Sequence, residues 1–160
     1  MSALTSKEFV LSTMRKYGEA TAKALQEKAD TMTGTELHKE SAFIPSFYAA
    51  LAKCNMLQRT KGFVCRSPQG NVVKLIQPYD SDIYKEEPEQ LTAHWGFKWS
   101  TDPKLAKPHL KSAESSYGVD ECCIWEGGIY ASEMENNTYT PTEYSDGWRF
   151  VCTVEELGNL

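Results

Sequence analysis

Residues 122–130 read Cys-Cys-Ile-Trp-Glu-Gly-Gly-Ile-Tyr. Hydrophobic, β-branched and aromatic residues stand on both sides of a Glu-Gly-Gly turn, which is the pattern of two short strands joined in a hairpin. The same character begins at Gly62 and continues to about residue 152, with Gly, Pro and Asn recurring at short intervals. Closely spaced turns between short strands are typical of small all-β modules. The sequence therefore predicts that the second half of the chain is β-structure.

The hairpin sequence has an earlier counterpart in the chain. When the chain is shifted by 57 residues, Cys65 aligns with Cys122, Gly70 with Gly127 and Val72-Val73 with Ile129-Tyr130. Further along, a shift of 53 residues aligns Pro88 with Pro141, Trp95 with Trp148 and Phe97 with Phe150. The change of shift places four extra residues in a loop of the first copy, where insertions are tolerated. We interpret the agreement as a duplication, with a first β-module at residues 60–100 and a second at 110–153. Each module is too small to hold a core alone, so we expect the two to pack together with a helix alongside.

Residues 1–58 read as helix, which makes the predicted fold class α+β. Thr5-Ser6-Lys7-Glu8 matches a capping box, and a weak apolar stripe with spacings of four and three follows from Val10 to Lys28. This helix is predicted to end near Lys28 or Ala29, before residues 31–35, and a second to run from about Pro45 to residues 56–57. A lone helix with so weak a stripe needs a partner, either the rest of the chain or other copies of itself. We therefore interpret residues 1–58 as an attachment or oligomerisation segment.

Composition excludes several classes of function. The net charge of −5 on 160 residues argues against nucleic-acid binding, which needs a basic face. No apolar stretch approaches the ~20 residues that span a membrane, and the N-terminus lacks the features of a secretory signal, so we expect assembly in a cytoplasm. The five cysteines form no C-x-x-C pair and the three histidines are scattered, so we expect reduced, buried thiols and no metal or other cofactor. No G-x-S-x-G, P-loop, G-x-G-x-x-G or H-E-x-x-H motif is present, so we do not expect an enzyme.

The second β-module carries a family resemblance. Its run Tyr-Gly-Val-Asp-Glu-Cys-Cys-Ile-Trp-Glu-Gly-Gly-Ile-Tyr at 117–130, continued by Asn-Asn-Thr-Tyr-Thr-Pro at 136–141 and closed by Gly-Trp at 147–148, resembles the chitin-binding-like carbohydrate-binding module. That family is small and all-β. It is attached to chitinases and other polysaccharide hydrolases, and it also occurs in structural proteins of tailed phages and prophages. Residues 77–81, 94–97 and 101–108 are most similar to the phage version, and the likeness covers residues 60–152.

The resemblance implies a phage virion protein, such as a head fibre, decoration or tail accessory protein, located on the particle. It would form a homo-oligomer, contact capsid or tail proteins, and adhere weakly to glycans through many copies. Two alternatives stay open: a purely architectural virion assembly protein that binds no sugar, and a detached non-catalytic domain of a polysaccharide hydrolase.

Sugar binding by such modules needs solvent-facing rings with hydrogen-bonding groups nearby. Trp125 at the hairpin tip and the two tyrosines flanking Pro141 are the candidate rings of the second module. The complete set of candidate site residues is Trp125, Tyr139, Tyr144, Glu135, Asn136 and Asn137.

The remaining rings are assigned by their place in the repeat. Tyr130, Trp148 and Trp95 occupy repeated or fold-defining positions, so we expect them in the core. The rings of the first module expected to be exposed are Tyr79, Tyr84 and Trp99. The first module lacks the acidic pair that precedes the first strand of the second, so we interpret it as scaffold.

Overall fold

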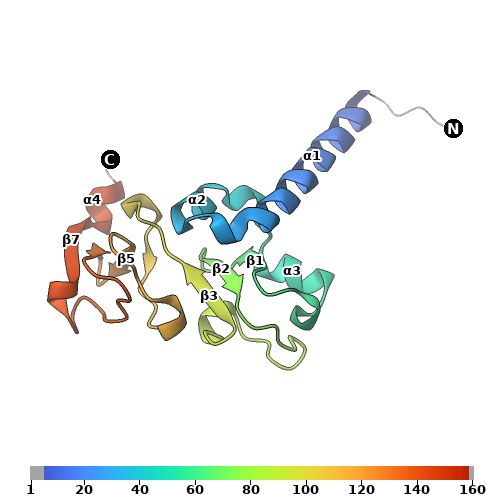
Figure 1. Cartoon of the computed structure of the whole chain (residues 1–160). Helices are drawn as coiled ribbons and strands as arrows, with labels where there is room; N and C mark the ends of the chain where they lie inside the picture. The colour runs from blue at the N-terminus through green and yellow to red at the C-terminus, as the bar shows by residue number, and fades with distance from the viewer. Residues whose placement is uncertain (1–5, 159–160) are drawn as a thin grey trace.

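The computed structural model describes residues 6–158 and shows an α+β protein, as predicted (Figure 1). Helix α1 leads into two β-sheets. The helices are α1 (Ser6–Lys28), α2 (Gly34–Lys39), α3 (Phe47–Lys53) and α4 (Val154–Gly158), with single 3-10 turns between the elements. The strands of the first sheet are β1 (Val64–Arg66), β2 (Val72–Leu75) and β3 (Trp95–Lys98). Those of the second are β4 (Lys107–Pro108), β5 (Cys122–Trp125), β6 (Gly128–Ser132) and β7 (Trp148–Thr153).

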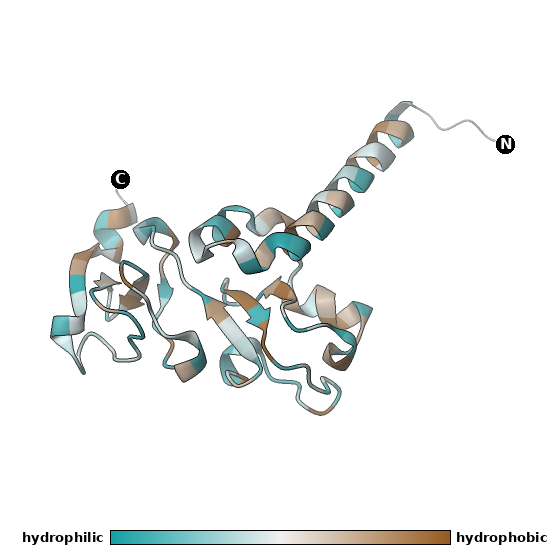
Figure 2. Cartoon of the chain, in the orientation of Figure 1, coloured by the Kyte–Doolittle hydropathy of each residue, from teal (hydrophilic) through white to brown (hydrophobic). Residues whose placement is uncertain are grey.

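Helix α1 projects from the rest of the molecule (Figure 1). It ends at Lys28, as the periodicity predicts, whereas Thr5 of the predicted capping box lies outside the described residues. Leu25 is the only α1 side chain that the fold buries, and Gln26 fixes this end of the helix by donating to the carbonyl of Val64 and accepting from its N–H. Hydrophobic residues nevertheless continue to the free end of α1 (Figure 2). Among residues 6–158, the hydrophobic side chains in the N-terminal half of this helix are therefore left exposed.

Helix α2 is absent from the sequence prediction, which treated residues 31–35 as the stop of the first helix. The structure places a capping box there: the Thr33 hydroxyl accepts from the N–H of Glu36 at 3.1 Å, and the Glu36 carboxylate accepts from the N–H of Thr33 at 3.4 Å. The predicted second helix exists as α3 but starts after a Ser46 cap rather than at Pro45. It ends at Lys53, and the expected end at residues 56–57 is a separate 3-10 turn.

The same three-strand pairing recurs in the two sheets. In each sheet the three strands are antiparallel in chain order, and the second sheet adds β4 parallel to β5 at its edge. Leu75 on β2 pairs with Trp95 on β3, and Ser132 on β6 pairs with Trp148 on β7. Between these paired residues the chain is four residues longer in the first sheet than in the second.

The first strand of each unit corrects the sequence alignment. Cys65 pairs with Val73, and the residue opposite Tyr130 is Cys123. If Val73 is aligned with Tyr130, Cys65 therefore takes the place of Cys123, not of Cys122 as the sequence alignment predicts. The physical reason is the hairpin, which has one more residue in the first unit than in the second.

One hydrophobic core joins both units. Its buried residues come from α3, from both sheets and from the segment between them: Phe47, Ala50, Met56, Cys65, Val73, Leu75, Tyr79, Trp95, Phe97, Trp99, Tyr117, Cys123 and Trp148. Trp99 stacks on Tyr117 with ring centroids 4.6 Å apart, and Tyr117 in turn meets Trp148 edge-on at 5.2 Å. A second cluster, to which α1 contributes Leu25, covers the other face of the first sheet through Val64 and Val72. The two units are therefore packed as halves of one core.

All five cysteines are free thiols; Cys65, Cys122 and Cys123 are buried as predicted, whereas Cys54 and Cys152, also expected to be buried, are only half-buried. Burial raises the pKa of Cys65 and of Cys123 to about 12, so both thiols are protonated at neutral pH. Within residues 6–158, no three His, Cys, Asp or Glu side chains gather in a way that could hold a metal ion. No helix in that range is long and apolar enough to cross a membrane.

Candidate functional site

Two exposed tyrosines stand together on the loop between β6 and β7. Tyr139 is 45% exposed and Tyr144 is 44% exposed. Their ring centroids are 5.5 Å apart with the planes tilted by 47°. Pro141 between them is buried, so it anchors the loop while the two rings face outward. We call these two rings the tyrosine pair; they form the aromatic surface expected from the sequence.

Trp125 lies beside this loop but is only half-exposed. Its Nε1 donates to the Thr142 hydroxyl at 2.8 Å, and its ring meets His109 edge-on at 5.8 Å. Part of the indole packs against the core that joins the two units. The predicted ring is therefore next to the tyrosine pair, with its N–H already engaged and its ring partly covered.

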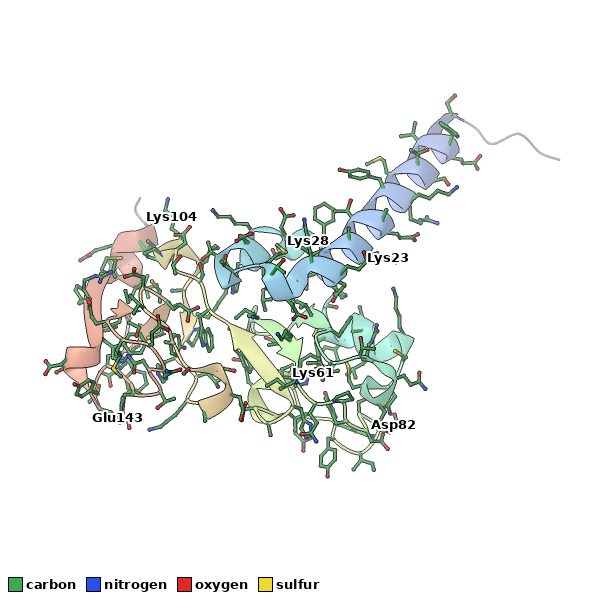
Figure 3. All side chains as sticks on the ribbon, viewed as in Figure 1. Lys23, Lys28, Lys61, Asp82, Lys104 and Glu143 are labelled. Carbon is green, nitrogen blue, oxygen red and sulfur yellow. The ribbon has the colours of Figure 1, made fainter. Side chains whose placement is uncertain are left out.

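The loop carrying the tyrosine pair is held by several hydrogen bonds. The carbonyl of Tyr139 accepts from His109 Nε2 and from Trp148 Nε1, both at 3.0 Å. Thr140 and Glu143 bond each other reciprocally at 3.1 Å. Glu143 also pairs with Lys111 at 2.7 Å, at the end of the molecule opposite α1 (Figure 3). These contacts present the rings on a fixed loop, which lowers the entropy that a ligand must overcome.

His109 was not among the predicted site residues. It comes from the β4 segment, stacks on Tyr117 at 5.1 Å, and reaches across to the loop. Burial lowers its pKa, against the opposite effects of the Tyr139 carbonyl and the Glu143 charge. Neutral His109 must carry its proton on Nε2 to donate to that carbonyl. No local sequence signal marks it, because its role depends on the pairing of β4 with β5.

Asn137 is a correction to the predicted site. Its side chain is fully buried. Its Nδ2 donates to the Ser132 hydroxyl at 3.1 Å and to the Gly147 carbonyl at 3.0 Å, while its Oδ1 accepts from the N–H of Tyr139 at 3.1 Å. Its backbone forms a bridge with Tyr117. Asn137 therefore shapes the loop from inside and cannot touch a ligand.

Asn136 and Glu135 are exposed but belong to other surroundings. Asn136 has a φ of 53°, so it fills a left-handed turn position that asparagine tolerates. The Glu135 carboxylate accepts weakly from the N–H of Val119 at 3.3 Å. The contacts of Glu135 are thus with the segment before β5 rather than with the rings.

Glu135 instead borders a polar cavity of about 550 Å³ between α2, β3 and the segment before β5. Glu121 lines it as well, and a Cβ on Gly118 would lie 2.9 Å from a Glu135 oxygen and 3.2 Å from a Glu121 oxygen. Burial raises the pKa of Glu121; the N–H of Gly118 at 2.6 Å opposes this shift, and the charge of Glu135 adds to it. The Glu121 and Glu135 carboxylates in the cavity can accept hydrogen bonds from a ligand, but the cavity is separate from the tyrosine pair.

The rings of the first unit are mostly internal. The prediction that Tyr79 and Trp99 are exposed is wrong, because each side chain is only 3% exposed. Inside the shared core, Trp95 donates a hydrogen bond to the Tyr79 hydroxyl, and Trp99 donates one to a backbone carbonyl. Tyr84 is exposed as predicted, and Trp95 and Trp148 are buried as predicted. Tyr130, expected in the core, is half-buried against it.

No family model, no curated protein and no solved structure matches the chain.

Proposed function

We propose that the protein is a structural component of a phage virion that adheres weakly to glycans through the tyrosine pair. The observation that carries this proposal is the pair of half-exposed rings on a hydrogen-bonded loop. Sugar C–H groups stack on such ring faces, and the polar residues of the loop offer partners for hydroxyls. The proposed role is binding and not catalysis.

The placement of the two ends supports a display role. Helix α1 projects at one end of the molecule, and the loop with the tyrosine pair lies at the opposite end (Figures 1 and 3). A protein attached to a particle through α1 would point the rings away from it. Many copies on one particle would convert weak single sites into useful avidity.

The likeness of the second unit to a chitin-binding-like module belongs to the same proposal, as does an origin of the two units by duplication. The recurrence of strand order and register supports the duplication. In the first unit, the shift of 53 residues places Glu86 and Leu91 where the second has Tyr139 and Tyr144. The first unit therefore serves as scaffold in this proposal.

Replacing Tyr139 or Tyr144 with alanine should weaken binding to insoluble chitin, or to the best ligand on a glycan array, by about tenfold or more. The measurement is a polysaccharide pull-down with the full chain. Tyr84→Ala is the matched control, since Tyr84 is equally exposed but lies on the first unit; it should leave binding unchanged. Absence of binding at millimolar sugar would sink the adhesion proposal.

The alternative, an architectural virion protein that binds no sugar, is favoured by one specific observation. Edge strand β7 and the start of α4 expose three apolar side chains, Phe150 at 54%, Val151 at 38% and Val154 at 41%. Exposed apolar side chains at a sheet edge suit a protein–protein contact. If Phe150→Ser removes the protein from particles while the tyrosine variants have no effect on any ligand, the architectural role is the better one.

Deleting residues 1–17 should reduce the proposed homo-oligomer to monomers without unfolding the body. The large hydrophobic side chains Phe9, Val10, Leu11, Met14 and Tyr17 are 51–71% exposed, so the fold loses little packing with them. Light scattering gives the mass, and thermal unfolding checks the body. Leu25→Ala is the contrasting variant: it should cost about 2–4 kcal/mol of stability and leave the free end of α1 intact. An oligomer that survives the deletion would exclude α1 as the assembly element.

A further inference from the structure

A groove of about 660 Å³ lies between the base of α1 and the α3–β1 region. Its walls come from α1 around Gly18 and Ala22, from residues 42–46, and from α3 around Ala49. We call it the basal groove. Its lining residues lie between residues 15 and 66, far along the chain from the tyrosine pair. The proposed roles of the tyrosine pair and of the exposed half of α1 do not involve this groove.

The basal groove gathers positive charge in an acidic chain. Its five basic lining residues are Arg15, Lys23, Lys53, Arg59 and Arg66, and Glu19 is its one carboxylate. Lys23 stands at the base of α1, above α3 (Figure 3). None of the ion pairs among residues 6–158 involves one of these five cations. Because the whole chain carries a net charge of −5, this local excess is opposite to the overall balance.

Two of the arginines are held in fixed positions by backbone carbonyls. Arg59 donates from Nη2 to the Ala50 carbonyl at 2.9 Å, and its guanidinium lies 4.2 Å from the centroid of the Phe63 ring. Its Nε is buried and has no acceptor. Arg66 donates from Nε to the Ile44 carbonyl at 2.9 Å. Each guanidinium therefore keeps N–H donors that no carboxylate in the groove occupies, on a side chain whose entropy is already reduced.

The floor of the basal groove is apolar. Alanines 22, 42 and 49 line it together with Phe43, Pro45 and Phe63. A purely polar polyanion such as a nucleic acid would leave this floor uncovered, and the net charge of the chain would repel it. A peptide that carries both carboxylates and apolar side chains complements both parts of the surface.

We propose that the basal groove binds an acidic, amphipathic segment of a partner protein. Its carboxylates pair with the free N–H groups of Arg59 and Arg66, with Lys23 and Lys53 at the rim, and its apolar side chains cover the floor. This proposal does not depend on sugar binding by the tyrosine pair.

The test uses the full chain and a fluorescein-labelled 14-residue peptide with glutamate and leucine at helical spacing. Fluorescence anisotropy should show saturable binding that weakens at least about tenfold between low and high salt. The double variant Lys23→Glu with Lys53→Glu should raise the Kd by about tenfold or more. The matched control changes the exposed Lys85 and Lys104 to glutamate, outside the groove, and should alter the Kd less than about twofold.

Arg66→Lys adds a second readout, because it keeps the charge but loses the planar pair of donors. We expect a severalfold weaker peptide complex, with thermal stability lowered only by the lost bond to the Ile44 carbonyl, about 1 kcal/mol. The proposal is overturned by absence of saturation at millimolar peptide, by equal binding of a peptide with lysine in place of glutamate, or by equal losses in the control variant. Tighter binding of a thymidine oligonucleotide would point to a nucleic acid instead. A change in oligomeric mass in the groove variant, without peptide binding, would make a second copy the occupant.

Discussion

Replacing Asn137 with alanine should lower the free energy of unfolding by about 3 kcal/mol. The substitution removes two donated hydrogen bonds and one accepted bond from a fully buried site. It also leaves the N–H of Tyr139 without its partner, and an unpaired donor costs more than the bond it loses, whereas the Gly147 carbonyl keeps the N–H of Glu133 at 2.9 Å. Urea denaturation followed by tryptophan fluorescence gives the change in stability.

Asn136→Gly is the control for this prediction. Asn136 is the neighbouring residue, exposed and in a left-handed conformation that glycine adopts freely, so its replacement should change stability by less than about 0.5 kcal/mol. If Asn137→Ala instead kept nearly full stability and abolished only glycan binding, Asn137 would be a ligand contact, and the interpretation of the loop would be wrong.

Replacing Gly34 with alanine should destabilise the protein by about 2–3 kcal/mol. Helix propensity alone predicts the opposite sign, because alanine is favoured over glycine within helices by about 1 kcal/mol. A Cβ on Gly34, however, would lie 1.9 Å from the carbonyl oxygen of Trp99 and 2.7 Å from its carbonyl carbon. These are backbone atoms of the segment that carries the Trp99 ring into the shared core, so they cannot move aside cheaply.

Gly18→Ala is the matched control, since it makes the same change within α1. Apart from the backbone of α1 itself and the two neighbouring residues, no atom of residues 6–158 lies within 4 Å of the Cβ that it would add. Helix propensity should therefore decide, and stability should rise by up to about 1 kcal/mol. Thermal unfolding of the two variants should therefore shift in opposite directions. If Gly34→Ala left the thermal stability unchanged, α2 would not pack closely against the backbone of Trp99.

The fold class and much of the strand pairing could be predicted because they depend on local patterns. Turn residues at short spacing mark the strands, and they predict the hairpins β1–β2 and β5–β6 that the structure shows. The first strand was misaligned by one residue because a sequence does not reveal that two hairpins differ in length. Helix α2 was missed although Thr33 and Glu36 form a capping box, since the sequence around Gly34 reads equally well as a stop signal.

The site was predictable only in part. Tyr139 and Tyr144 flank a proline in a loop, and such rings are exposed unless another segment covers them. Trp99 has similar local surroundings, yet Tyr117 covers it, and that contact joins residues of different units. Asn137 and Asn136 are adjacent and chemically identical, and only the tertiary fold places one inside and the other outside.

The stack of Trp99 on Tyr117 determines whether the two sheets can be separated and used apart. Because the rings cross from one sheet to the other, a cut in residues 101–110 would leave each half with a broad hydrophobic face in water. Both halves should exchange their slowest amide protons at the same free energy, as a single foldon. An engineer who wishes to graft the tyrosine loop onto another scaffold must therefore transfer both sheets together.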